Sequence, residues 1–286
     1  MTSSPTLLLT IYCVAIAGFS LAGGLLPGVL KMTHTRMQLV MSLVSGLILG
    51  VAFFHLLPHS AVEIGGEHAV DTAVWWLMTG LVVMLMLLRL FHFHQHDFSD
   101  EEVHAHDHHA HAHAHAHAHE QPAHGLSWVG IALGLSLHTL IDGVALGAVM
   151  HGGGIEAGLV GLGVFLAILL HKPLDSMSIV TIMKAGGWSG AAQFRANAAF
   201  ALMCPLGALL FYFGVDSLLL DKTYVVGAAL AFSAGAFICI ALSDLLPEVH
   251  FHSHDRGKLT IAFLLGLALA YAIGTVEPAG LHALEH

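Results

Sequence analysis

The sequence predicts an all-α integral membrane protein with eight transmembrane helices. Of its 286 residues, 56% are hydrophobic and only 10% are charged, and the mean hydropathy is +0.79. Soluble domains carry about 25% charged residues, so this chain has too few to cover a water-facing surface. Eight stretches approach the roughly 20 apolar residues that a helix needs to cross the hydrocarbon. Alternating strand patterns are absent, and lipid does not tolerate an open sheet edge.

The expected spans divide the chain into four parts. Spans one to three fall in residues 1–91, a loop covers 92–124, spans four and five fall in 125–183, and spans six to eight fall in 184–286. The N-terminus lacks the basic region of a secretory signal, so the first apolar stretch is expected to be a retained helix. The eight spans are expected at residues 7–30, 37–58, 72–91, 126–150, 157–183, 192–213, 224–247 and 259–277.

The positive charges predict how these spans are oriented. With eight spans, seven of the nine Lys and Arg residues fall on one side, which the positive-inside rule assigns to the cytoplasm. Both termini are then extracytoplasmic. The choice between a plasma or inner membrane and an organelle membrane stays open. The seven residues are Lys31, Arg36, Arg89, Lys184, Arg195, Arg256 and Lys258.

The loop at 92–124 contains thirteen histidines, interleaved mainly with alanine. Such a tract cannot bury a core and is expected to be disordered on the cytoplasmic side. Neutral imidazoles suit Zn, Cu, Ni and Co, so the tract predicts a cytoplasmic metal-binding loop, with a polar linker of no further role as the alternative. Its central histidines are His104, His106, His108, His109, His111, His113, His115, His117 and His119.

Ionisable side chains recur at matched positions in the fourth and fifth spans. His138 and Asp142 lie in the middle of one span, and His171 and Asp175 lie in the next. In each pair the imidazole precedes the carboxylate by four residues, so both share one helix face. Ionisable groups inside spans are costly and by default functional. Together they form a suitable tetrahedral set for zinc, with a polar network between packed helices as the alternative.

Two residues of the fifth span bear on such a site. Lys172 cannot ligate a metal while protonated, so its ammonium is expected to pair with Asp142 or Asp175 and to set charge and affinity. Pro173 removes one backbone hydrogen bond and frees a carbonyl one turn earlier. The freed carbonyl could line a metal path, and the alternative is that Pro173 only kinks the helix.

An internal repeat links the second and seventh spans. Residues 46–59 resemble 235–248, with Gly and Leu-Leu-Pro in register and metal-capable residues on both sides of Leu-Leu-Pro. The two spans run in opposite directions, and inverted repeats are typical of transporters whose substrate site lies near the midplane. Chance similarity between apolar runs is the alternative. The flanking residues predict an access path, or else interfacial polar caps: His55, His59, Asp244 and Glu248.

Several other functions lack their sequence features. Nine Lys and Arg residues cannot build a nucleic-acid surface. Cys13, Cys204 and Cys239 lie in apolar runs without a CxxC pair, which argues against a disulfide framework or a thiolate zinc site. The HExxH motif of metalloproteases and a GxSG-type nucleophile turn are both absent, so no enzyme is expected.

Four motifs resemble those of the ZIP metal transporters: HLLPHS at 55–60, HTLIDGVALGA at 138–148, LLHKPLDSMSI at 169–179 and SDLLPEVH at 243–250. The resemblance covers nearly the whole chain and is strongest to branches with His-Lys in the fifth span. It implies a 3+2+3 arrangement of helices with inversely repeated outer triplets. It also implies transport of Zn²⁺, Fe²⁺ and related ions into the cytosol between spans four and five, by a bundle that slides against a fixed scaffold.

The resemblance also assigns positions. His138, Asp142, His171 and Asp175 match the family's primary metal site.

At the second-site positions the chain departs from the family pattern. Thr139 stands where Asn is often found, Lys172 where a carboxylate is usual, and Cys204 where Glu often precedes the proline. A single occupied site is therefore expected, with the Lys172 ammonium in place of a second ion.

Two other classes remain as alternatives. A membrane receptor or sensor would bind zinc without moving it. A cation-diffusion-facilitator exporter also uses two H-x-x-x-D motifs, but such chains resemble six spans followed by a cytoplasmic domain. The oligomeric state stays open, with a homodimer as one alternative, as do the energy source and the selectivity among Zn, Fe, Mn and Cd.

Overall fold

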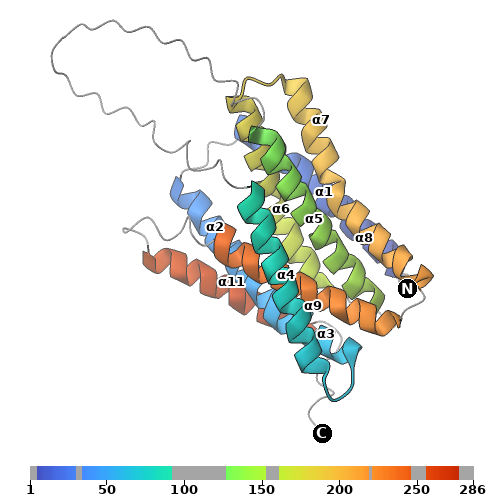
Figure 1. Ribbon diagram of the computed structural model, residues 1–286. Helices are drawn as coiled ribbons and strands as arrows, with labels where there is room; N and C mark the ends of the chain where they lie inside the picture. The colour runs from blue at the N-terminus through green and yellow to red at the C-terminus, as the bar shows by residue number, and fades with distance from the viewer. Residues whose placement is uncertain are drawn as a thin grey trace, which may run out of the picture.

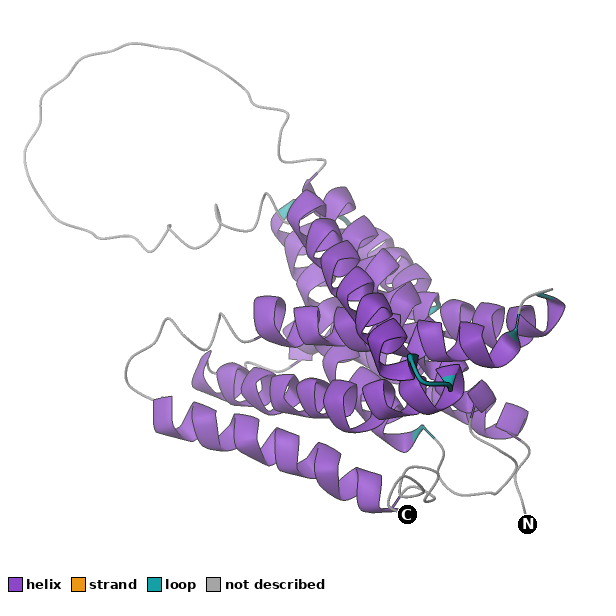
Figure 2. Cartoon of the chain, turned by 60° about the horizontal axis from the view of Figure 1, so that its bottom comes forward, coloured by secondary structure: helices purple, strands orange, loops and turns teal. Residues whose placement is uncertain are grey.

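The computed structural model describes residues 5–29, 34–91, 127–152, 161–218, 221–245 and 256–276, and these residues form helices without a single strand (Figure 2). Eight helical segments within these ranges are long and apolar enough to cross a membrane, as the sequence predicts. The chain is therefore an all-α, multi-pass integral membrane protein.

The eight spans are built from helices of different regularity (Figure 1). The first three are α1 (Pro5–Val29); α2 (His34–Val51), which continues through the π-helical η1 (Ala52–Leu56) into α3 (Leu57–Ile64); and α4 (Ala69–Phe91). The fourth and fifth are α5 (Ser127–Gly152) and α6 (Leu162–Ala185). The last three are α7 (Gly190–Ala201) with α8 (Met203–Gly214) and the short 3₁₀ turn η4 (Val215–Ser217); α9 (Lys222–Ile240) with the π-helical η5 (Ala241–Leu245); and α11 (Arg256–Val276).

The second span is longer than the expected 37–58, because the helix continues past Pro58 to Ile64. A proline inside a regular α-helix loses a hydrogen bond and clashes with the carbonyl four residues earlier. Here η1 immediately precedes the turn that holds Pro58, and its wider i→i+5 pattern changes the backbone register at that point. The helix ends at Gly65, whose φ of 62° favours glycine.

Glycines bring α2 and α11 into backbone contact. A Cβ atom on Gly46 would lie 2.0 Å from the carbonyl oxygen of Phe263, and one on Gly266 would lie 2.0 Å from that of Leu43. No side chain fits at these distances, so the two helices approach as closely as small residues permit in membrane proteins.

The pair α4 and α9 repeats this arrangement. A Cβ atom on Gly80 would lie 1.9 Å from the carbonyl oxygen of Phe232, and one on Gly235 would lie 1.9 Å from that of Leu77. Gly46 and Gly235 are the glycines that align in the sequence repeat. The two copies therefore share a helix contact as well as a sequence motif.

The π-helices also follow the repeat. Both η1 and η5 begin at the alanine six residues after the aligned glycine, and in the sequence each leads into Leu-Leu-Pro. A five-residue π segment is rare in proteins and occurs frequently at functional sites. Its presence in both copies makes chance similarity between two apolar runs a poor explanation of the repeat.

The described helices pack as two groups. In one group α5 contacts α8 and α6 contacts α1, and α7 extends along α1 and α6. In the other, α2 pairs with α11, and α9 pairs with α4 and α3. The groups meet mainly where α9 lies against α5 and where α2 lies against α6. This places α5 and α6 at the centre of the molecule, with the outer faces of α4 and α11 exposed.

Candidate metal centre

The four histidine and aspartate residues predicted from α5 and α6 meet between these helices. His138 and Asp142 lie one turn apart on α5, and His171 and Asp175 do so on α6. Their exposed fractions are 1%, 0%, 1% and 8%, in that order, so the cluster is closed to solvent.

The distances within the cluster suit a metal ion. Asp142 Oδ2 lies 3.3 Å from His138 Nε2 and 3.2 Å from His171 Nε2. Asp175 Oδ2 lies 3.6 Å and 3.9 Å from the same two nitrogens. One ligand atom each from His138, His171 and Asp175 lie within 4.8 Å of one another, a group that does not include Asp142. Ligands about 2.0–2.2 Å from a tetrahedral zinc ion are about 3.4 Å apart. The separations from Asp142 are already near this spacing, and those from Asp175 are longer.

A hydrogen bond to the backbone orients the imidazole of His171. His171 Nδ1 donates to the Ala167 carbonyl at 2.7 Å, so Nε2 of the neutral ring carries a lone pair. That lone pair faces Asp142 Oδ2, itself an acceptor, at 3.2 Å. Two acceptors at this distance repel each other unless a proton or another cation lies between them.

Three buried atoms of the cluster lack hydrogen-bond partners among the described residues. They are Nδ1 and Nε2 of His138 and Oδ1 of Asp142. The contact between His138 Nε2 and Asp142 is close enough for charge interaction but lacks hydrogen-bond geometry. Unpaired buried polar atoms are costly and uncommon. Their concentration here favours a binding site over a network that only joins two helices.

Lys172 holds the two carboxylates together. Its Nζ lies 2.5 Å from Asp142 Oδ2 and 2.9 Å from Asp175 Oδ2, and it donates to Thr139 Oγ1 at 2.9 Å. Both expected partners are therefore bound at once, and the side chain is completely buried. With neutral imidazoles, two carboxylates and one ammonium leave a single negative charge, which attracts a cation.

The other second-site positions lie around this ammonium. Thr139 accepts its third hydrogen bond, and the Phe200 ring lies 5.8 Å from Nζ. Cys204 is buried at the start of α8, where that helix packs against α5 at Gly143. The residues around Lys172 thus come from α5, α6, α7 and α8, all within one helix group.

Of the four residues predicted for an access path, the structure describes the side chains of His55 and His59. His55 is buried in η1, where its Nε2 donates to the Ala270 carbonyl at 2.8 Å, and its ring lies against Gly163 of α6. His59 is half-buried in α3. Asp244 belongs to η5, and Glu248 falls outside the described residues. The histidines of the 92–124 loop also fall outside them.

Sequence reasoning missed two features that position the site. One is the Ala167 carbonyl that fixes the tautomer of His171, because backbone acceptors leave no trace in a motif. The other is a buried pair of hydroxyls, Ser20 Oγ and Ser176 Oγ, which are 2.7 Å apart and join α1 to α6 next to Asp175. The only signal for the second feature was an unusually polar run, Asp-Ser-Met-Ser, inside a span.

Eight membrane-spanning helices around a buried His/Asp cluster define a polytopic membrane protein of the kind that handles metal ions. The family model described as ZIP Zinc transporter matches residues 6–274, nearly the whole chain, so the chain belongs to the ZIP zinc transporter family. A search of curated proteins finds no match. Family membership makes the protein a transporter of zinc or related divalent metals.

Proposed function

We propose that this protein moves Zn²⁺ across the membrane toward the cytosol through a site formed by His138, Asp142, His171 and Asp175. The observation that carries the proposal is the buried convergence of two imidazoles and two carboxylates between α5 and α6. Nitrogen and oxygen ligands of this kind suit zinc, and they also admit Fe²⁺ and other divalent transition metals. We therefore expect related ions to compete with zinc for transport.

A single metal ion occupies this site in our proposal. Lys172 occupies the position beside the two carboxylates where a second cation would otherwise bind. Its Nζ contacts both carboxylates. When zinc enters, the carboxylate oxygens turn toward the metal, and the ammonium keeps its bond to Thr139. When zinc leaves, the ammonium again neutralises part of the charge, which favours metal release.

The packing of the helices suggests how the ion crosses. Both ligand-bearing helices belong to the same group, and α9 of the other group, which lies against α5, buries mostly small or apolar residues, such as Leu230, Ala234 and Phe237. Small and apolar contact residues allow one group to slide past the other. The family resemblance implies such a sliding motion, and the separation of the helices into two groups supports it.

The direction rests on the positive-inside rule and on the family resemblance. On this orientation the histidine tract at 104–119 lies in the cytosol, where it receives or stores arriving metal. Its imidazoles would bind zinc weakly compared with a closed four-ligand site.

The test is zinc entry into proteoliposomes that contain a zinc-sensitive dye, with protein-free liposomes as the control. An inward zinc gradient is expected to give saturable dye signal only when the protein is present. Equilibrium binding is measured on the same preparation. Binding without entry would overturn the transport proposal in favour of a receptor or sensor.

A further inference from the structure

A buried hydroxyl without a partner lies on α9, the helix that packs against α5 from the other helix group. Ser233 has an exposed fraction of 0%, and its Oγ has no hydrogen-bond partner among the described residues. The other buried serines that the structure describes are all hydrogen-bonded, as Ser42 is to the Leu259 carbonyl at 2.9 Å. An unpaired buried hydroxyl is costly, although a helical serine can bond to the carbonyl four residues earlier. The observed packing therefore does not explain a serine at this position.

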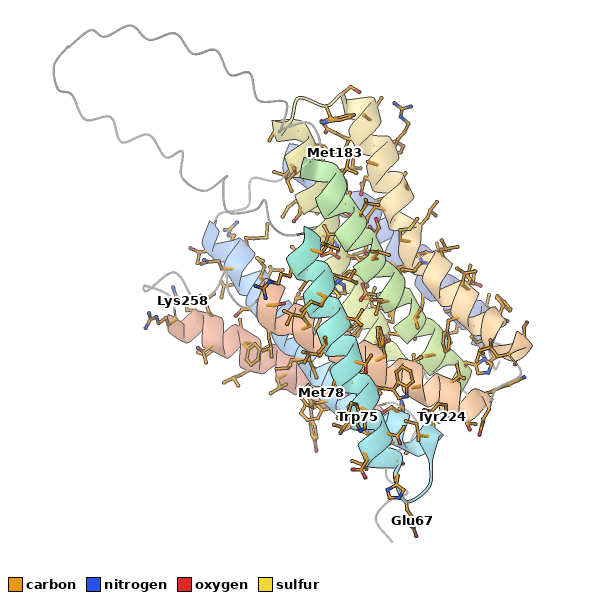
Figure 3. All side chains as sticks on the ribbon, in the orientation of Figure 1. Glu67, Trp75, Met78, Met183, Tyr224 and Lys258 are labelled. Atoms are coloured by element: carbon orange, nitrogen blue, oxygen red, sulfur yellow. The ribbon has the colours of Figure 1, made fainter. Side chains whose placement is uncertain are left out.

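The contacts at the end of α5 show which face of α9 carries Ser233. A Cβ atom on Gly152, the last residue of α5, would lie 3.2 Å from a Cγ atom of Val226 near the start of α9. Ser233 follows Val226 by seven residues, close to two helical turns, so both lie on the face of α9 toward α5. Figure 3 shows Tyr224 at the end of the molecule where α9 begins and Met183, near the end of α6, at the opposite end.

The same seven-residue spacing leads along α5 from its last residue to the metal centre. Ala145 and His138 lie seven and fourteen residues before Gly152 and share its face. Because α9 begins where α5 ends, the two helices run in opposite directions, and Ser233 is about level with Ala145. Asp142 lies three residues further from Gly152, which is about one helical turn. The metal centre thus begins about one turn from the level of the unpaired hydroxyl.

Asp142 carries a complementary unpaired atom. Its Oδ2 lies beside both imidazoles and the Lys172 ammonium, but its Oδ1 is buried and has no hydrogen-bond partner among the described residues. Carboxylates that bind a metal are commonly held by further hydrogen bonds, which orient them. A hydroxyl donor on α9 and a carboxylate acceptor on α5 are therefore both unpaired, about one turn apart along neighbouring helices.

We propose that Ser233 is a positioning residue for the transport site in a second arrangement of the two helix groups. When α5 moves by one helical turn, about 5.4 Å, toward the end where α9 begins, Asp142 becomes level with Ser233. The hydroxyl then donates to Oδ1 and orients the carboxylate, whose Oδ2 binds the metal. With the orientation that the positive charges predict, this end is extracytoplasmic, so Ser233 acts when the site accepts zinc from outside. The inference deepens the proposed transport function and rests on it.

The test measures zinc entry into proteoliposomes over a range of external zinc concentrations, together with the melting temperature of the metal-free protein. Ser233→Ala is expected to raise the half-saturating zinc concentration about tenfold, as removal of a group that orients a metal ligand does, with a smaller change in maximal rate. The same variant should melt at or above the wild-type temperature, because it removes an unpaired buried hydroxyl. Ser233→Thr keeps the hydroxyl and should retain the wild-type half-saturating concentration.

Ser42→Ala is the control within the same helix group. It removes a buried hydroxyl that bonds to the Leu259 carbonyl and joins α2 to α11. This variant should melt at a lower temperature than the wild type and keep the wild-type half-saturating zinc concentration. A purely structural role of Ser233 would give the same pattern in Ser233→Ala.

A wild-type half-saturating concentration in Ser233→Ala, or the same increase in Ser233→Thr as in Ser233→Ala, would overturn the inference and leave the transport function in place. A melting temperature that falls as in Ser42→Ala would show that the hydroxyl is paired in the observed arrangement, and it would also overturn the inference. Absence of zinc entry in the wild type would instead overturn the proposed function, and this inference with it.

Discussion

At the scale of single residues, Lys172 decides the charge of the centre. Among the described residues, it is the one buried cation that contacts both carboxylates. Removing one partner of a buried ion pair leaves uncompensated charge, which costs about 3–5 kcal/mol. The same removal leaves more negative charge for an arriving metal.

Lys172→Met, which nearly preserves volume, is therefore expected to lower the melting temperature of the metal-free protein and to tighten zinc binding about tenfold or more. Zinc should restore much of the lost stability, because a ligand that binds only the folded state stabilises it. Turnover should fall because release becomes harder. Calorimetric binding and proteoliposome flux measure the two effects separately. Unchanged affinity and unchanged rate would mean that Lys172 does not set the charge of the site.

At the scale of helices, α1 supports α6 at the site. A Cβ atom on Gly23 would lie 2.3 Å from the Cα of Pro173, which follows Lys172 directly. The helix α6 continues through Pro173 as a single element. With the Ser20–Ser176 contact one turn away, α1 holds this part of α6 in place.

Gly23→Ala is expected to push α6 away from α1 and to destabilise the protein by about 1–3 kcal/mol, as overpacking does in general. Zinc affinity should fall with it, because the ligands of α6 move relative to those of α5. Gly18→Ala is the matched control, since a Cβ atom there meets nothing within 4 Å. Thermal melting and zinc titration of both variants test this. Equal behaviour of the two variants would show that the close approach has no role.

The elements also show what sequence can and cannot predict. Eight spans followed from apolar length alone, because lipid demands about 20 such residues. The H-x-x-x-D spacing predicted that His138 and Asp142 share a face of α5, and the structure confirms that geometry. The extension of the second span through Pro58 was not predictable, because a proline normally signals a helix end or kink and a π segment has no clear sequence signature.

At the scale of the whole molecule, the sequence shows that α5 and α6 are consecutive spans, but it does not show how they pack against each other. Which faces oppose each other depends on the packing of α9, α8 and α1 around them. The partners of Lys172 are an example. The sequence predicts a pair with either Asp142 or Asp175, and in the structure the ammonium contacts both carboxylates. The histidine tract lies beyond what the structure describes, so its role rests on chemistry alone.

Deletion of residues 104–119 is expected to reduce the zinc bound per chain while leaving uptake through the central site in place. The tract supplies many separate imidazoles, whereas the proposed site depends on none of them. Binding stoichiometry and initial flux, measured on the same preparation, separate the two contributions. Complete loss of flux in the folded deletion variant would make the tract an obligatory part of the pathway.

The most direct measurement of the central claim is zinc flux into proteoliposomes for His138→Ala and Asp175→Ala, one ligand from each helix. His68→Ala is the matched control, because this histidine is highly exposed and lies outside the cluster. We expect both ligand variants to lose nearly all flux and His68→Ala to retain it, with all three proteins equally folded. Wild-type flux in either ligand variant would contradict transport through the cluster between α5 and α6.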